Sequence, residues 1–489
     1  MNATEEQFRA LFEPRGVIVA GASTHPAKFG FVTLHNIKAH GYTGNVYATN
    51  REGEEILGFP TAHDIDEVPD GECDLVVICT PAGANPDILR ACAKKGVRAA
   101  FVTSAGYREA GPEGEQAERE LVALGDELGI LIAGPNGQGL VSTPSSLCAM
   151  IVAPYPPAGP ISIASQSGNF VSSLMNYARQ TGIGVARAVS AGNAAALSVG
   201  DYLEWYGRDD ATAVAIAYIE HVADGRALAD QLRSVSERKP VVVVKGGVTA
   251  GGARAAASHT GALASEDRVF DGAIRQAGVI RAGNLEEAFE AAASFATQPL
   301  PRGPRTAIVT TAGGWGVVTA DAVWNSSLEL MPLPADLRAE IDKKLPPRWS
   351  GNNPIDMAGG ETRDTIPEVL DLVASHPDVD AVIYLGLGIQ SNTARQIRSG
   401  PFFPEYGLER IAAFHERQDQ RFAEAAAAVS ESSGKPVLTA TELAVGDPDN
   451  AGPLTVRRTG RLCYASANRA VTALDHMWRY ARWRDRRGL

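Results

Sequence analysis

One histidine in this sequence follows a pattern that favours chemistry at the end of a buried strand. Residues 239–264 begin with the apolar run 241–244, continue through a glycine-rich stretch and reach His259. An unbroken β-branched run is typical of a strand buried on both faces of a parallel sheet, and open α/β sheets bind ligands at the carboxyl ends of such strands. An imidazole near neutral pH is a competent nucleophile. The alternative is a glycine-rich surface loop whose His259 only contacts a backbone carbonyl.

Two further polar groups follow predicted strands in the same part of the chain. Glu220 ends the predicted strand 213–219, and a carboxylate there could orient an imidazole and fix its tautomer. The turn SQSG follows the predicted strand 161–164 and enters a helix, whose first N–H groups can receive an anion. Each signal has a plainer explanation, because Glu220 could be an exposed strand end and a serine–glycine turn is common.

The opening βα turn is predicted to bind a phosphorylated adenosine ligand. It has the sequence GASTHPAKFG over residues 21–30, without the GxGxxG spacing. The second strand then ends in Asn50 and Arg51, where an NAD site places a carboxylate for the ribose hydroxyls. A dinucleotide dehydrogenase is therefore disfavoured, and Lys28 and Arg51 are available as phosphate partners. The alternative is that these segments are simply tight βα turns.

Short apolar strands alternate with helical patterns along the chain, which predicts parallel βαβ units. The predicted strands are residues 17–20, 46–48, 75–79, 100–103, 131–133, 161–164, 213–219, 241–244, 307–310, 381–385 and 437–440. Pro-rich stretches at 152–160 and 297–304 divide the sequence, because proline ends helices and removes hydrogen-bond donors. We therefore expect three α/β domains, over residues 1–150, 158–298 and 304–489. In the third, the turn TTAGGWG enters a helix, and the polar turn NNPIDMAGG is expected beside it.

The composition excludes several classes of protein. A formal net charge of −12 over 489 residues argues against nucleic acid as a partner. The five cysteines lack CxxC or other metal-ligand spacing, which fits reduced thiols in a cytoplasmic protein. No apolar run is long enough to cross a membrane, and the first residues are too polar for a signal peptide.

Five motifs in a fixed order carry a family resemblance. They are TSAGYREAG (103–111), GPNGQGL (134–140), SQSG (165–168), SHTGALA (258–264) and TTAGGWG (310–316). Together they resemble the ADP-forming (NDP-forming) acyl-CoA synthetases, and more distantly the succinyl-CoA synthetases. The resemblance covers nearly the whole chain. It implies an α/β fold with a Rossmann-like CoA-binding domain followed by two flavodoxin-like parallel-sheet ligase domains.

The resemblance also implies a reaction and its catalytic residues. In this family an acyl-CoA, phosphate and ADP, or GDP, are converted reversibly to an acid, CoA and ATP, or GTP, through an acyl phosphate and a phosphohistidine. Matched residue by residue, His259 would be the phosphorylated nucleophile and Glu220 the carboxylate that orients it. The phosphoryl group would be bound at two helix starts, formed by Ser165, Gln166, Ser167 and Gly168, and by Gly313, Gly314 and Gly316.

Ligand contacts follow from the same match. CoA would contact Gly21, Ser23, Lys28, Gly30, Asn50, Thr80, Pro81, Ser104 and Ala105. The carboxylic substrate would contact Asn136, Gly192 and Asn193. No metal ligand is expected in this chain.

Several positions depart from the family pattern. Gly137 replaces the usual cysteine of the GPNC motif, which predicts a larger acyl pocket. Ala194, Ala195 and Ala196 follow Asn193 where relatives are more polar, and Trp315 lies in a turn that is usually AGGPG. Residues 391–422 match nothing in the family pattern and are predicted to be an insertion.

The ATP-grasp module of the family is not found in this sequence. We therefore expect a heteromer in which a separate β-type subunit binds ADP or ATP with Mg²⁺, while this α-type chain binds CoA, phosphate and a small carboxylic acid. A CoA- or acyl-CoA-binding protein without turnover is the first alternative. A nicotinamide-dependent oxidoreductase is the second.

Overall fold

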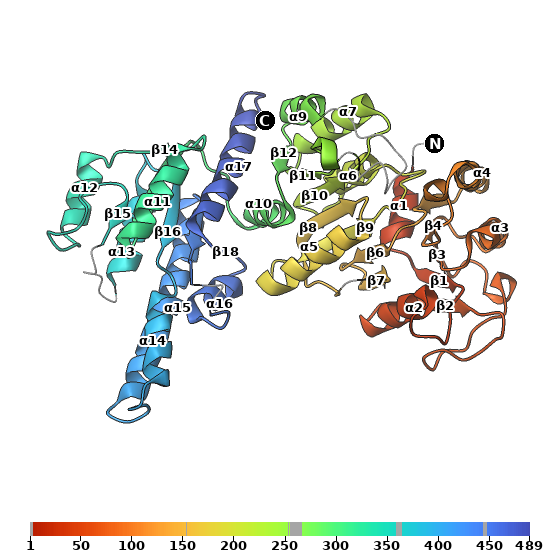
Figure 1. Cartoon of the computed structure of the whole chain (residues 1–489), viewed down its shortest axis with the longest axis horizontal. Helices are drawn as coiled ribbons and strands as arrows, with labels where there is room; N and C mark the ends of the chain where they lie inside the picture. Colours follow the sequence, from red (N-terminus) through yellow and green to blue (C-terminus); the bar gives the residue numbers. More distant parts are fainter. Residues whose placement is uncertain (1–2, 153, 253, 255–266, 358–363, 444–446) are drawn as a thin grey trace. The chain divides into compact units, whose positions relative to one another are not determined.

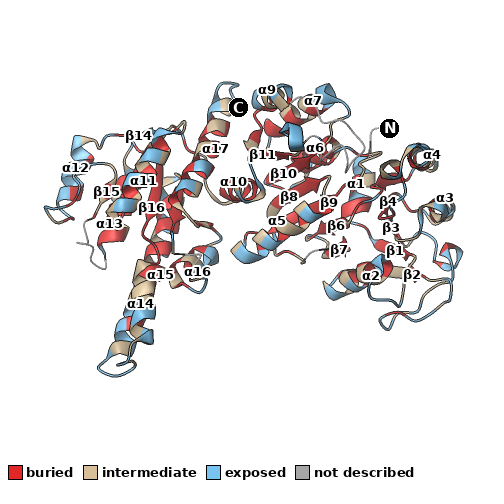
Figure 2. Ribbon diagram, viewed as in Figure 1, coloured by how far each residue is buried: buried red, intermediate tan, exposed pale blue. Residues whose placement is uncertain are grey.

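The computed structural model describes residues 3–152, 154–252, 254, 267–357, 364–443 and 447–489 (Figure 1). It divides into two compact units. The first contains residues 1–180 and 184–288, and the second contains residues 181–183 and 289–489. Buried residues concentrate in the strands of each unit, and exposed residues lie on the outer faces of the helices (Figure 2). The expected α/β class with three mainly parallel sheets is confirmed.

The first sheet is fully parallel, with strand order β2-β1-β3-β4-β5. Its strands are β1 (Gly16–Ala20), β2 (Asn45–Thr49), β3 (Leu75–Ile78), β4 (Ala99–Val102) and β5 (Leu131–Ala133). Helices α2 (Phe29–Ala39), α3 (Asn85–Lys94) and α4 (Pro112–Leu128) connect them. All five strands lie at apolar runs in the sequence. Four of them, β1, β3, β4 and β5, are buried along their whole length, which a continuous apolar run favours.

The second sheet has seven strands, in the order β12-β11-β10-β8-β9-β6-β7. They are β6 (Gly139–Ser142), β7 (Leu147–Met150), β8 (Ala158–Ser165), β9 (Val185–Ser190), β10 (Val214–Ile219), β11 (Val241–Lys245) and β12 (Ile280–Ala282). Its helices are α5 (Gly168–Thr181), α6 (Val199–Arg208), α7 (Gly225–Ser236), α9 (Asp267–Gln276) and α10 (Leu285–Thr297).

The hairpin of β6 and β7 departs from the expected arrangement. It lies within the predicted first domain, residues 1–150, yet β6 pairs antiparallel with β9 of the second sheet. The change of sheet therefore comes before the Pro-rich stretch 152–160 rather than at it. An antiparallel hairpin needs only a short turn, so the chain can add it to the edge of the second sheet before the first parallel strand, β8, begins.

Helix α1 (Glu5–Phe12) joins the first sheet to a helix of the second. Thr4 and Gln7 form a capping box at its start. Phe12 stacks on Trp205 of α6 with ring centroids 5.0 Å apart, and Phe8 stacks on the same indole at 5.5 Å. Arg187 is almost fully buried near this stack, with its guanidinium 5.4 Å from the Trp205 ring centroid. The arginine forms ion pairs with Asp209 and Glu13.

The second unit contains a parallel sheet in the order β14-β13-β16-β17-β18, with β15 also paired to β13. The strands are β13 (Arg305–Thr310), β14 (Glu329–Leu330), β15 (Ile355–Asp356), β16 (Ala381–Leu385), β17 (Val437–Ala440) and β18 (Cys463–Tyr464). The helices are α11 (Gly313–Trp324), α12 (Ala335–Asp342), α13 (Thr365–Ser375), α14 (Ile389–Ser399), α15 (Leu408–Ser433), α16 (Ala451–Arg458) and α17 (Ala467–Asp485). The NNPID turn lies beside the TTAGGWG turn as predicted, because β15 pairs with β13.

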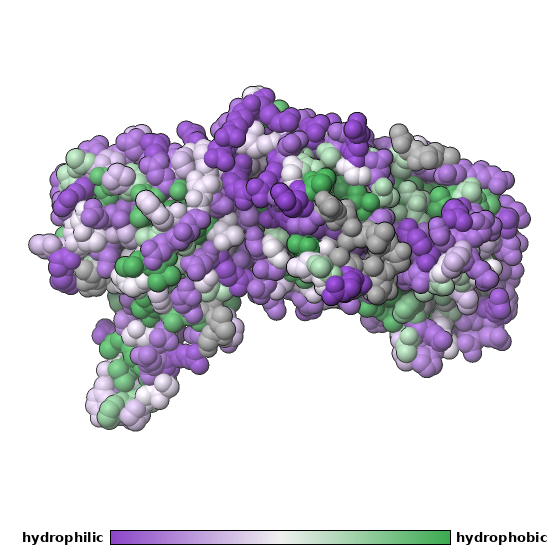
Figure 3. All heavy atoms as spheres, turned by 45° about the horizontal axis from the view of Figure 1, so that its top comes forward, coloured by the Kyte–Doolittle hydropathy of each residue, from purple (hydrophilic) through white to green (hydrophobic). Residues whose placement is uncertain are grey.

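Residues 391–422, which matched nothing in the family pattern, fall mainly in the helical hairpin of α14 and α15 (Figure 1). Asp419 of α15 is fully buried and accepts hydrogen bonds from the N–H groups of Gly388 and Ser391 at the start of α14, at 3.0 and 2.6 Å. Hydrophobic and hydrophilic side chains are mixed over the hairpin surface (Figure 3). Across the described residues, no helix has the length and apolar character that crossing a bilayer requires.

Candidate functional site

A polar cavity of about 180 Å³ lies where β8, β9 and β10 end. It brings together seven of the predicted site residues: Asn136, Gln166, Ser167, Gly168, Gly192, Asn193 and Glu220. The other lining residues were not predicted: Arg108, Gln138, Asn169, Ser190 and His221. Arg108 and Gln138 lie inside motifs that the sequence analysis identified, and Asn169 directly follows one, so proximity to those motifs was the available signal.

Glu220 follows β10 and is buried, with 9% of its surface exposed. The Tyr218 hydroxyl donates a hydrogen bond to its Oε1 at 3.0 Å. Its backbone N–H donates to Gln166 Oε1 at 2.6 Å, and its backbone oxygen accepts from Lys245 Nζ at 2.9 Å. The carboxylate is therefore not the exposed strand end that the sequence left open as an alternative.

The SQSG turn joins β8 to α5 and holds its shape through Ser165. This serine's Oγ accepts from the Ser167 N–H at 3.0 Å and donates to the Ser167 carbonyl at 2.6 Å. The Gln166 side chain also binds protein, since Nε2 donates to the His221 carbonyl at 3.1 Å and Oε1 accepts from two backbone N–H groups. Both side chains therefore shape the turn, and the N–H groups at the start of a helix such as α5 can receive an anion.

The wall that carries Asn193 is an ordered polar network. Its Nδ2 donates to Glu109 Oε2 at 2.6 Å and to Glu118 Oε2 at 2.7 Å. Because two carboxylates accept from this nitrogen, the amide orientation is fixed and Oδ1 accepts from Asn136 Nδ2 at 3.3 Å. Arg108 Nη2 donates to the Asn193 carbonyl at 2.5 Å. The network holds both asparagines in one orientation each.

Burial and hydrogen bonding have opposite effects on the pKa of Glu109 in this wall. Burial by itself would raise the pKa of Glu109, but hydrogen bonds from Asn193 and from backbone N–H groups of its own turn hold that pKa below its ordinary value. Glu118 is also buried, and its Oε1 lies 3.6 Å from Arg108 Nη1. The Arg108 guanidinium therefore lies beside Glu118, and Asn193 joins Glu118 to Glu109.

Gly137 does not enlarge the cavity. A Cβ atom at this position would lie 2.5 Å from the Ser190 carbonyl oxygen and 2.7 Å from the Phe101 ring. The space that a cysteine would take is therefore already filled by Phe101, and Gly137 is not among the described lining residues. The expectation of a larger acyl pocket from this glycine is wrong.

The predicted CoA contacts gather at the carboxyl ends of β1 to β4. Gly30 at the start of α2 packs so closely on the opening turn that a Cβ would lie 2.1 Å from the Gly21 oxygen. Gly21 itself has φ +84°, which favours glycine. The Asn50 side chain donates to the Ala22 carbonyl at 3.0 Å and so ties the end of β2 to this turn. The free N–H groups of α2 are thereby aimed at the sheet edge, as a phosphate site requires.

Asn85, which was not predicted, joins the turns that carry the remaining predicted CoA contacts. It is fully buried, and its Oδ1 accepts from Thr80 Oγ1 at 3.0 Å. Its Nδ2 donates to the Tyr107 hydroxyl at 2.7 Å and to Ser104 Oγ at 3.2 Å. The Asn136 N–H donates to the Ser104 carbonyl at 3.0 Å, which connects the CoA turns to the polar cavity.

His259 and the glycines of the TTAGGWG turn, both predicted to act in phosphoryl transfer, are not among the described residues that line this cavity. His259 lies outside the described residues. Gly313, Gly314 and Gly316 begin α11 in the second unit, where a Cβ on Gly313 would lie 2.5 Å from Asp356 Oδ2. Within the described ranges, no cluster of histidine, cysteine, aspartate and glutamate side chains is arranged to hold a metal ion.

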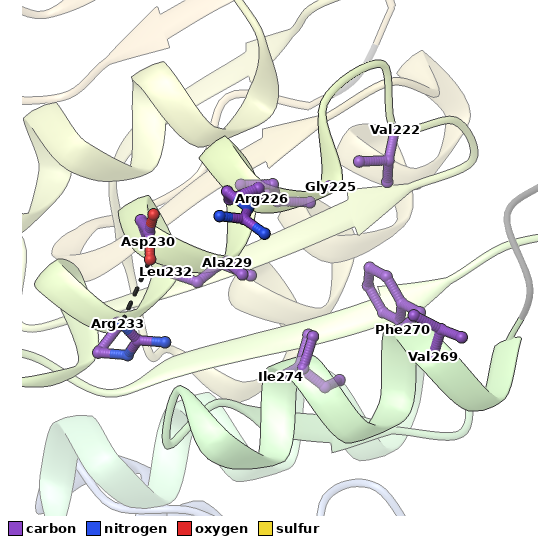
Figure 4. A pocket seen from close by; sticks show the side chains of 12 residues that line it. Val222, Gly225, Arg226, Ala229, Asp230, Leu232, Arg233, Val269, Phe270 and Ile274 are labelled. Carbon is purple, nitrogen blue, oxygen red and sulfur yellow. Dashed lines mark hydrogen bonds and ion pairs between the residues drawn. The ribbon is translucent and has the colours of Figure 1, made fainter.

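A second and larger cavity, of about 670 Å³, lies between α7 and α9 (Figure 4). Its walls are mostly apolar, with Phe270 and Ile274 on one side and Ala229 on the other, and an ion pair of 3.2 Å joins Arg233 to Asp230 at its rim. None of the predicted site residues is among the described residues that line it. The smaller polar cavity is therefore the candidate active site.

Comparison with known proteins agrees with this organisation. Three family models match the chain: a CoA binding domain over residues 15–143, a succinyl-CoA ligase like flavodoxin domain over 158–295 and a ligase-CoA domain over 306–390. The α subunit of ADP-forming acetate–CoA ligase I from Pyrococcus furiosus is 36% identical over 382 residues, which are 77% of this chain and 82% of that protein.

Longer relatives and a solved structure extend the match. ADP-forming acetate–CoA ligase I of Archaeoglobus fulgidus is 36% identical over 76% of this chain, but the match spans only 54% of that protein. The dinucleotide forming acetyl-coenzyme A synthetase 1 of Ca. Korarchaeum cryptofilum, solved with phosphate and ADP, is 32% identical with a TM-score of 0.84. That alignment covers 99% of this chain and 98% of the solved one.

Proposed function

The chain belongs to the ADP-forming acyl-CoA synthetases, as an α-type chain, and from this we propose that it interconverts acyl-CoA, ADP and phosphate with a carboxylic acid, CoA and ATP. Phosphate attacks the thioester carbonyl, which breaks the C–S bond and gives an acyl phosphate and the CoA thiolate. The His259 imidazole then attacks phosphorus, and the carboxylate leaves. The phosphohistidine finally transfers its phosphoryl group to ADP, which forms ATP and restores the imidazole.

Residues of the polar cavity have separate tasks in this sequence. The N–H groups at the start of α5 stabilise the charge of the transferred phosphoryl group, which is close to two negative charges on an imidazole. Asn136 contacts the acyl group, and Asn193 holds the Asn136 amide in place. Glu220 accepts the imidazole N–H and keeps the other nitrogen directed at phosphorus. Phosphoryl transfer needs mainly positioning and charge stabilisation, which this set of donors and one carboxylate supplies.

The observation that supports the proposal most is that residues from the first sheet and from the second sheet line one cavity. Glu220 and the SQSG turn come from the second sheet, whereas Arg108 follows β4 of the first. The hydrogen bond between Asn136 and Ser104 links the cavity wall to the CoA turns. A thioester bound at the first sheet would therefore present its carbonyl beside the phosphoryl acceptor.

The lining of the cavity supports a small acid as the substrate. Its described lining contains no aliphatic, phenyl, phenol or indole side chain, only glycines and polar groups that include the His221 imidazole. Sites that bind larger apolar ligands are lined mainly by hydrophobic side chains. Short aliphatic acids are therefore favoured over aromatic ones.

We further propose that a β-type ATP-grasp chain binds the nucleotide and Mg²⁺. A match that spans 82% of an α subunit but 54% of a longer ligase supports this division. The choice between ADP and GDP would then lie in the partner, and the histidine would carry the phosphoryl group between the two chains.

The proposal is tested by phosphate transfer. Incubation of the chain with a β-type partner and Mg-ATP is expected to give acid-labile protein phosphate, which CoA and a short acid discharge. His259→Ala should carry no label, because His259 is the only histidine in residues 239–264. Absence of label on the wild-type chain, together with tight binding of CoA, would leave a CoA-binding protein without turnover.

A further inference from the structure

Tyr218 lies two residues before Glu220 on β10, so both side chains point to the same face of the sheet. The phenol is buried, with 9% of its surface exposed, and its ring packs against Phe170 of α5 with centroids 3.7 Å apart. Its hydroxyl donates to Glu220 Oε1 at 3.0 Å. A ring held by packing has one orientation, and it therefore fixes the carboxylate that it contacts.

The hydroxyl remains a donor at every pH of interest. Burial, and then the neighbouring Glu220 carboxylate, raise the pKa of Tyr218 well above its usual range. A protonated phenol beside an ionised carboxylate forms a charge-assisted hydrogen bond, which is stronger than a neutral one. The Tyr218 hydroxyl therefore keeps the terminal torsion of Glu220 from rotating.

The backbone of Glu220 is held as firmly as its carboxylate. Gln166 Oε1 accepts from its N–H at 2.6 Å, and the buried ammonium of Lys245 donates to its carbonyl at 2.9 Å. Lys245 Nζ also donates to the carbonyl of Gly246, the first residue of the glycine-rich loop. The end of β10 is thus tied to the turn before α5 and to the loop that leads toward His259.

Gly246 leaves the space that this arrangement needs. A Cβ on Gly246 would lie 2.6 Å from the Tyr218 hydroxyl oxygen and 3.2 Å from Glu220 Cγ. A side chain at position 246 would therefore push the tyrosine and the glutamate out of place together. The absence of that side chain is a requirement of the Tyr218–Glu220 contact, in addition to any freedom it gives the loop.

We propose that Tyr218 is a positioning residue for phosphoryl transfer, which fixes the Glu220 carboxylate in the orientation that receives the His259 imidazole. The inference rests on the proposed function, in which Glu220 orients His259. It adds that the carboxylate is not positioned by its own backbone alone. Carboxylates that orient an imidazole need their own hydrogen-bond partners, and Tyr218 supplies one here.

The test measures the rate of His259 phosphorylation from Mg-ATP, with the β-type partner present, by rapid quench. Tyr218→Phe keeps the ring and removes one hydroxyl, and we expect it to slow phosphorylation about ten-fold, the effect of one hydrogen bond to a charged group. Glu220→Gln should be slower still. In the double variant the loss of the hydroxyl should add less than about two-fold, because residues that act through one another are not additive.

Two further variants separate positioning from stability. Tyr206→Phe removes a buried hydroxyl in the same domain, which donates to the Ile163 carbonyl at 3.1 Å, and should lower thermal stability without slowing phosphorylation. Gly246→Ala should slow phosphorylation as Tyr218→Phe does, since it displaces the same contact.

Several results would overturn the inference. Phosphorylation of Tyr218→Phe or of Gly246→Ala at the wild-type rate would do so. An equally large effect of Tyr218→Phe in the Glu220→Gln background would also do so. A wild-type chain that takes no phosphate would remove the proposed function itself, and this inference with it. The wild-type measurement therefore distinguishes the two failures.

Discussion

The carboxyl edges of the first and second sheets are built in contrasting ways. At the edge of β1 to β4, the predicted CoA contacts Lys28, Pro81 and Ala105 are exposed, and the buried Asn85 binds neighbouring turns to one another. At the edge of β8 and β10, Glu220 is itself buried and is tethered at its N–H, its carbonyl and its carboxylate.

The difference follows from what each edge is proposed to do. A large ligand such as CoA can be bound by many weak contacts, and backbone N–H groups at helix starts need no particular side chain. Phosphoryl transfer depends on a few groups held within a fraction of an ångström. Removing a single side chain at the first edge should therefore have a small, separable effect, whereas removing one at the second should have a larger and coupled effect.

The largest effect is expected from a buried charge that supports the second sheet away from the cavity. Arg187 donates to Asp209 Oδ2 at 3.2 Å and to Ser142 Oγ at 2.5 Å, with almost no exposure. Arg187→Met should lower the free energy of unfolding by about 3–5 kcal/mol, because it leaves a buried carboxylate unpaired. Chemical denaturation measures this. A lower phosphorylation rate per folded molecule in Arg187→Met would contradict a purely structural role for Arg187.

The same variant has a pH dependence of known sign. Burial alone would raise the pKa of Asp209, but Arg187 and further hydrogen bonds bring it below the ordinary value. A carboxylate whose pKa is lower in the folded state than in the unfolded state stabilises the protein at pH values above the unfolded-state pKa. This stabilisation is lost as the pH falls through the folded-state pKa. The difference in the free energy of unfolding between wild type and Arg187→Met should therefore be largest near neutral pH and should become smaller below about pH 4.

A smaller effect is expected from one glycine of the first edge. Gly30→Ala places a Cβ 2.1 Å from the Gly21 oxygen and opens the turn that presents the α2 N–H groups. Strain of this kind costs about 1–3 kcal/mol, so the Kd for CoA measured by calorimetry should rise about ten-fold or more. Gly272→Ala is the matched control, because a Cβ there has nothing within 4 Å. Unchanged CoA affinity in Gly30→Ala would place the ligand elsewhere.

The smallest effect should come from an exposed charge at the same edge. Lys28 precedes α2 and is exposed. Exposed ion pairs contribute about 0.2–1 kcal/mol, so Lys28→Ala should weaken CoA binding by no more than about five-fold. The loss should shrink at high salt, where surface charges are screened. A loss as large as that of Gly30→Ala would mean that the first edge also depends on single side chains.

Local sequence patterns predicted β1 to β4 at the first edge and β8 and β10 at the second, because a strand buried on both faces needs a continuous apolar run. They did not predict β9, which also ends at the cavity. The runs around Val76 and Val243 correspond to β3 and β11. The β6–β7 hairpin was missed, since its place depends on pairing between distant residues such as Gly139 and Ser190. The family resemblance assigned Asn136 and Asn193 to the substrate and Glu220 to the histidine, and all three line the polar cavity.

The supporting residues of the site were largely invisible in the sequence. Asn85 carries no local pattern, and its role depends on Tyr107 and Ser104 in another turn. Arg108 lies within a recognised motif, yet its partner Asn193 is far along the chain. The prediction of a larger acyl pocket at Gly137 was wrong for the same reason. Phe101, which fills the space that a side chain at position 137 would take, belongs to a strand elsewhere in the sequence.

The stack of Phe8 and Phe12 on Trp205 has a consequence for the order in which the protein is made. Their partner indole is synthesised only after them, once the whole first sheet and the first four strands of the second have been made. At about 5–20 residues per second, this delay is on the order of ten seconds or more. During that time the nascent chain carries an unpaired aromatic helix, which gives a chaperone a binding site and makes fragments that stop before α6 prone to aggregate.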